Sequence, residues 1–202
     1  MTSYLVKVKY MARIINKPSI DISSFLLNSL ITFVIVVFVT FINGTVTLEI
    51  GNFVWLPIGA VSLCYLLFGF RVCISVFIGI SLSSYLFHNG TFSGLALLHL
   101  VGTFSPLLAI AAMKFFKLST FFDGSKIVFQ HLLFLGILTA LFNTLMKFFV
   151  FSYSGIEINA LKFIQSYLIG DVLGCLVVLF FAALVIVPGI RKFAPNLVPL
   201  EK

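Results

Sequence analysis

The chain has 202 residues, of which 61% are hydrophobic and 9% are charged, and its formal net charge is +7. Soluble domains carry about 25% charged residues, and a soluble chain this apolar would expose large hydrophobic patches and aggregate. The composition therefore excludes an ordinary soluble domain and predicts a protein that is embedded in a lipid bilayer. The basic residues lie at the ends of apolar runs, which is typical of topology signals and of contacts with anionic lipid, so nucleic acid is not an expected partner.

Apolar segments recur along the chain, and a membrane-spanning helix needs about 20 mainly apolar residues. The sequence predicts an all-α fold, a polytopic transmembrane helical bundle with about six spans. The transmembrane domain is expected over residues 23–190, between a basic cytoplasmic tail at 1–22 and a short cytoplasmic tail at 191–202. The expected spans are Ser24–Asn43, Phe53–Phe70, Val72–Phe87, Gly94–Phe115, Ile127–Phe151 and Leu161–Val187.

The second and third spans are short, and only the corner Gly69-Phe70-Arg71 separates them. If both cross the membrane, they form a tight helical hairpin. The competing interpretation is one long, bent segment. The run that starts at Phe25 is too long for the apolar core of a signal peptide, so we expect it to stay in place as the first span.

The distribution of Lys and Arg predicts the orientation. With six spans, eleven of these residues fall on one face of the membrane and two, Lys147 and Lys162, on the other. Loops rich in Lys and Arg stay in the cytoplasm, so both termini are expected there. We expect a multi-pass protein of a bacterial inner membrane.

Polar residues within the spans are the candidates for function, since they are costly in lipid. Asp171 lies in the last span, with Ser166, Gly170 and Gly174 on a small-residue stripe that permits close helix approach. Asp171 is either a packing group or part of a ligand site. Asn143 and Lys147 lie four residues apart, hence on one helix face, and Asn143 is expected near the depth of Asp171. Lys147 could reach Asp171 or extend to the outer headgroups.

Four further residues in the spans have predicted roles. His99 lies in the outer part of the fourth span, where a hydrogen-bonded packing role competes with ligand binding. Trp55-Leu56-Pro57-Ile58-Gly59 opens the second span. Trp55 is expected in the aromatic belt at the outer interface, Pro57 in the first helical turn, and Gly59 at a close helix contact.

Soluble-enzyme motifs are lacking, so no catalytic residue, metal site or cofactor is expected. The three cysteines, Cys64, Cys73 and Cys175, lie in or beside apolar runs without a CxxC pair and are expected to be buried apolar residues. The sequons at Asn43 and Asn89 are interpreted as turns rather than glycan acceptors.

Two blocks together resemble a known family. Trp55-x-Pro57-x-Gly59 with Gly69-x-Arg71, and later Gly170-Asp171-x-x-Gly174, are similar to the W-P-P-A-G and W-x-G-D-x-x-G patterns of the MASE-type membrane-associated sensor domains of bacteria. The resemblance covers roughly residues 50–190. It implies a sensory input module, which in that family is usually joined to a histidine kinase or diguanylate cyclase.

This chain departs from the family pattern in several places. Leu56 replaces the first proline, and Tyr167 stands near the place of the late tryptophan. The chain has about six expected spans where the family has about eight, and no output domain follows, so a separate kinase or cyclase partner is expected. Carried over by position, the family's motif residues are Trp55, Pro57, Gly59, Arg71, Gly170, Asp171 and Gly174.

Two functional hypotheses follow. In the first, a sensory module binds a small ligand in its outer half through Asp171, Asn143, Lys147, His99, Tyr167 and Trp55. In the second, the chain is the substrate-binding membrane subunit of a vitamin-type transporter, which six short-looped spans of this length also fit. An enzyme is not expected, and homo-oligomer formation is left open. The lipid bilayer is the expected partner.

Overall fold

The structure, a computed structural model, describes residues 22–46, 54–87, 92–118, 129–155 and 159–186, and every element in these ranges is helical. The predicted all-α fold is therefore confirmed for the described residues, while nearly all of both predicted tails and the sequon at Asn89 lie outside them. The elements are α2 (Ile22–Val46), α3 (Leu56–Phe68), the 3-10 turn η1 (Gly69–Val72), α4 (Cys73–Phe87), α5 (Phe92–Phe115), α6 (Phe129–Tyr153), α7 (Ala160–Phe181) and the π-helical turn η3 (Ala182–Ile186).

The described helices contain five stretches that are long and apolar enough to cross a membrane. Four of them fall within α2, α5, α6 and α7 with its π-helical extension. The fifth runs without interruption through α3, η1 and α4, over 32 residues from Leu56 to Phe87. Length and composition therefore support a membrane protein. By the same criteria, the predicted second and third spans form a single apolar stretch.

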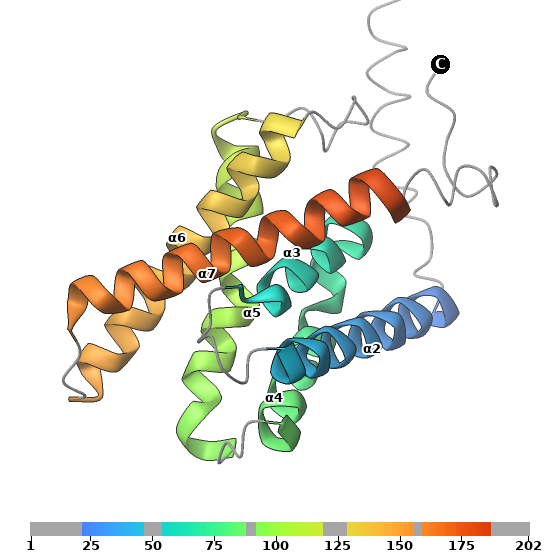
Figure 1. Ribbon diagram of the computed structural model, residues 1–202. Helices are drawn as coiled ribbons and strands as arrows, with labels where there is room; N and C mark the ends of the chain where they lie inside the picture. The colour runs from blue at the N-terminus through green and yellow to red at the C-terminus, as the bar shows by residue number, and fades with distance from the viewer. Residues whose placement is uncertain (1–21, 47–53, 88–91, 119–128, 156–158, 187–202) are drawn as a thin grey trace, which may run out of the picture.

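The tight hairpin predicted at Gly69–Arg71 is wrong, because α3 and α4 do not pack side by side. Both legs instead contact α2 and α5, which occupy the space between them. Gly69 makes the corner possible: its φ of 72° and ψ of −165° lie in a region that is open almost exclusively to glycine. The two legs diverge from η1, as Figure 1 shows for the teal and green segments.

Contacts along the helices establish their relative directions. Gly79 of α4 lies against Val36 of α2, and Phe87 further along α4 meets Phe41 further along α2, so these two helices are parallel. Residue contacts between the other neighbouring helices show that α3, α5 and α7 run in one direction. Helices α2, α4 and α6 run in the opposite direction. Figure 1 shows the antiparallel pair of α6 and α7 crossing the bundle.

The bundle has its polar side chains inside and its apolar side chains outside, the reverse of a soluble protein. Asp171, Asn143, Thr103 and Ser105 are all buried, while Ile74 and Leu161 are 70% and 66% exposed. Several inner hydroxyls are satisfied within their own helices, while those of Thr32, Thr139 and Thr144 have no partner among the described residues. Ser105 and Thr103 each donate to the carbonyl four residues earlier, at 2.6 and 2.8 Å. This arrangement suits lipid as the surrounding solvent, because most of the exposed side chains in the middle of the helices are apolar.

Helix α3 begins inside the bundle, and this feature positions the candidate site. The Trp55 backbone N–H donates to the Gly170 carbonyl at 2.9 Å, ten residues into α7. The next N–H, of Leu56, donates to Oδ1 of the buried Asn43 on α2 at 2.8 Å. Because ten helical residues rise about 15 Å, Trp55 lies beside the middle of α7. Asn43 is thus an acceptor for the start of α3, and the turn predicted at Asn43-Gly44 is wrong, because both residues lie within helix α2.

Candidate functional site

A buried carboxylate forms the centre of the candidate site. Asp171 is 1% exposed and Asn143 is fully buried. The Asn143 Nδ2–H group donates to Asp171 Oδ2 at 2.6 Å, which places the two residues at one depth, as the sequence predicted. The Ser105 hydroxyl of α5 lies 3.5 Å from Asn143 Oδ1, so polar groups from three helices meet here. Asp171 is therefore held in one orientation by a neighbour that is itself fixed by packing.

Lys147 lies one turn beyond Asn143 on the same face of α6. Its ammonium Nζ is 4.9 Å from the centroid of the Tyr167 ring, within the range of a cation–π contact. The same ring stacks on Phe163, with centroids 4.3 Å apart. The sequence left two alternatives for Lys147, a reach toward Asp171 or an extension to the headgroups. In the structure Lys147 contacts Tyr167 and lines a cavity that Asp171 also lines.

The two sequence blocks that resemble the sensor family meet at the crossing of α3 and α7. A Cβ atom added to Gly59 would lie 2.6 Å from the Gly174 carbonyl oxygen, and one added to Gly174 would overlap the Trp55 carbonyl group. Only hydrogen at these two positions permits the backbones to approach so closely. The glycines therefore allow Trp55 to lie beside Asp171, although 116 positions separate them in the chain.

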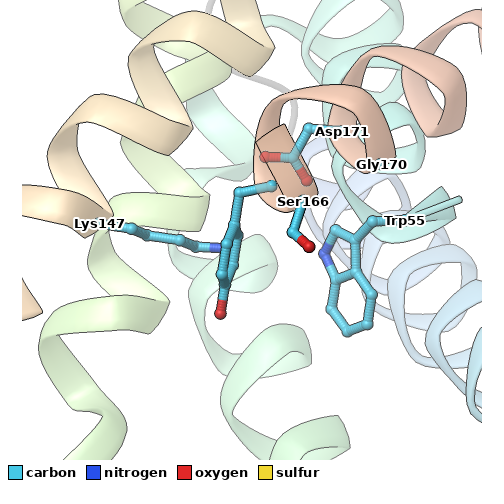
Figure 2. A pocket seen from close by; sticks show the side chains of 6 residues that line it. Trp55, Lys147, Ser166, Gly170 and Asp171 are labelled. Carbon is cyan, nitrogen blue, oxygen red and sulfur yellow. The ribbon is translucent and has the colours of Figure 1, made fainter. Parts of the chain in front are cut away.

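A cavity of about 230 Å³ lies between the start of α3, the C-terminal half of α6 and the N-terminal half of α7. Figure 2 shows Lys147 reaching in from one side, with Asp171, Ser166 and Trp55 opposite. Pockets for drug-sized ligands are about 300–1,000 Å³, so this cavity suits something smaller. Its lining residues are Trp55, Lys147, Ser166, Tyr167, Gly170 and Asp171.

Most of the predicted ligand-binding residues come together here, and one does not. Trp55, Lys147, Tyr167 and Asp171 line the cavity, and Asn143 lies behind the carboxylate. His99 is elsewhere: its Nδ1 atom is 3.1 Å from the Ser81 hydroxyl, between α4 and α5. This is the hydrogen-bonded packing role that was the alternative for His99, so we do not include it in the site.

Most of the predicted motif residues lie near the cavity, and one, Arg71, does not. Pro57 and Gly59 are buried in the first turn of α3, and Gly170 and Gly174 are buried on α7. Arg71 is exposed at the η1 corner, away from the cavity lining.

Sequence reasoning missed two contributors. Ser166 was recognised only as one of the small residues of α7, yet it lines the cavity. Its spacing from Gly170 and Gly174 could have identified it, because it lies on the same helix face. Asn43 supports the start of α3 from 13 residues away on another helix. No local pattern signals such a contact.

The cysteines and histidines of the described residues do not gather into a metal-binding group. No set of three His, Cys, Asp or Glu side chains in that part of the chain could hold a metal ion. Cys64 and Cys175 are buried free thiols and Cys73 is partly buried.

Comparison of the chain with protein-family models, with curated proteins and with solved structures finds no match.

Proposed function

We propose that the protein is a sensory membrane module that binds a small solute in the cavity between α3, α6 and α7. The observation that carries this proposal is the buried Asp171 carboxylate, which is oriented by Asn143 and faces a cavity shared with Lys147 and Trp55. A charged group within a membrane helix usually marks a ligand or ion path. A ligand at this place touches all three helices and so biases how α3 packs against α7.

The proposal includes a topology of six membrane-crossing legs with both termini in the cytoplasm of a bacterial cell. The alternating helix directions support it, since they bring the start of α2 and the end of α7 to one face. The excess of Lys and Arg expected on that face agrees with the positive-inside rule. The solute would then reach the cavity from outside the cell. A separate kinase or cyclase would read the change, as the resemblance to sensor domains implies.

Ligand binding is tested by thermal unfolding of the purified chain in nanodiscs against a library of small metabolites. We expect at least one compound to raise the unfolding temperature of the wild type by several degrees, because a ligand that binds only the folded state stabilises it. Trp55→Ala and Asp171→Asn should abolish that increase. His99→Ala is the matched control, since it removes a buried polar side chain outside the cavity. A library without any stabilising compound, or an increase that persists in both cavity variants, would contradict the proposal.

Uptake of a solute is the second candidate, and the start of α3 inside the bundle favours it. Transporters commonly bind substrate where a helix begins or breaks near the bilayer midplane. Gentle solubilisation and identification of co-purifying proteins separates the two functions. A kinase or cyclase supports sensing, whereas an ATPase or a transporter subunit, together with lower solute uptake in cells lacking the gene, supports transport.

A further inference from the structure

The two formal charges of the cavity, on Asp171 and Lys147, form no direct ion pair with each other. Among the described residues, Asp171 uses Oδ2 to accept from Asn143, and its Oδ1 atom makes no hydrogen bond. In the same part of the chain, Lys147 Nζ contacts the face of Tyr167 and forms no ion pair within 4 Å. A carboxylate oxygen and an ammonium group therefore line one small cavity with unused bonding capacity. Charges in such a place need partners, because desolvation without a partner is costly.

We propose that the ligand is a small zwitterion of the amino-acid class, which deepens the proposed function and rests on it. Its ammonium group donates to Asp171 Oδ1 and lies beside the Trp55 ring, and its carboxylate accepts from Lys147 Nζ. A simple anion would meet the Asp171 charge, and a simple cation would meet the Lys147 charge. A molecule that carries both charges makes a charge-assisted hydrogen bond to each of the two residues, and the site and ligand together stay neutral within the membrane.

The rest of the lining fits this ligand. Trp55 and Tyr167 offer aromatic faces, which attract an ammonium group and also cover a short apolar side chain. The Ser166 hydroxyl can both donate and accept. The volume of about 230 Å³ favours amino acids with short side chains over larger ones.

The test measures equilibrium binding of glycine, L-alanine, L-serine, L-threonine and L-proline to the full chain in nanodiscs. We expect at least one to bind. Removing either charge from the ligand should weaken binding at least about tenfold, since each charge-assisted hydrogen bond is lost. For L-alanine the matched probes are ethylamine, which lacks the carboxylate, and propionate, which lacks the ammonium group.

Protein variants separate recognition from folding. Asp171→Asn and Lys147→Met should each weaken zwitterion binding at least about tenfold. Asp171→Asn should also shift preference toward propionate, because the cavity then carries only the Lys147 charge; a purely structural role would not change this ratio. Lys162→Met, at an exposed position of α7, is the matched control and should bind like the wild type. Thermal unfolding without ligand shows whether each variant is folded.

Two results would overturn the zwitterion inference: none of the five amino acids binds, or the singly charged probes bind as well as the zwitterion. These results are distinguishable from failure of the proposed function. If a metabolite of another class stabilises the wild type but not Asp171→Asn, the cavity is a ligand site for different chemistry. If no metabolite does so, both proposals fail.

Discussion

Gly174→Ala should destabilise the protein by about 3 kcal/mol, because overpacking at a rigid contact has few ways to relax. The added methyl group would overlap the Trp55 carbonyl and lie 2.9 Å from the Leu56 nitrogen, all of which are backbone atoms. Backbone cannot move aside as the end of a flexible side chain can, so α3 must separate from α7. The free energy of unfolding in mixed micelles measures this loss.

Gly102→Ala is the matched control on another helix of the bundle. There the added methyl group would meet only Ile80 Cδ1, at 3.6 Å, which is an ordinary contact. We expect its stability to stay within about 0.5 kcal/mol of the wild type or to rise, since alanine favours helix more than glycine does. If Gly174→Ala is as stable as Gly102→Ala, the close crossing of α3 and α7 is wrong.

Asn143→Leu should also cost about 3 kcal/mol, for an electrostatic reason. Leucine has a similar size but cannot donate, so the buried Asp171 carboxylate loses its 2.6 Å hydrogen bond. Removing one partner of a buried charged hydrogen bond leaves the other desolvated and unpaired. A double-mutant cycle with Asp171→Leu should give a coupling free energy of about 1 kcal/mol or more, because both partners are then apolar.

Thr144→Val is the control for this prediction, one residue along the same helix. Thr144 is as buried as Asn143, but its hydroxyl has no hydrogen-bond partner within the described residues. Replacing it with the isosteric valine should therefore be neutral or stabilising. Equal losses in Asn143→Leu and Thr144→Val, or a coupling free energy near zero, would show that Asn143 and Asp171 do not interact.

The sequence predicted the parts of the site that local spacing controls. Asn143 and Lys147 lie on one helix face because they are four residues apart, and counting rise per residue brought Asn143 to the depth of Asp171. The Gly170–Gly174 spacing predicted a close helix contact, which the structure shows against Trp55. These inferences needed only helical geometry and the cost of polar groups in lipid.

The sequence did not predict the features of the fold that depend on packing between distant segments. Residues 56–87 form one continuous stretch of high mean hydropathy, so hydropathy could not show that α3 starts beside the middle of α7. That start depends on two acceptors from other helices, Asn43 and the Gly170 carbonyl. In the same way, α2 and α5 separate α3 from α4, and no local feature of the Gly69 corner predicts this. The six-span topology and the ligand-binding roles stay predictions.

The central claim is that the cavity is a solute site open to the outside of the cell, and labelling of Ser166→Cys tests it most directly. In a background with Cys64, Cys73 and Cys175 replaced, a membrane-impermeant thiol reagent is added to intact cells. We expect Ser166→Cys to react, as should Ser154→Cys at the exposed turn after α6, while the buried Thr139→Cys stays unlabelled. A stabilising ligand should slow the reaction at Ser166→Cys alone. If Ser166→Cys stays unlabelled while Ser154→Cys reacts, the cavity is closed to the outside and the account is contradicted.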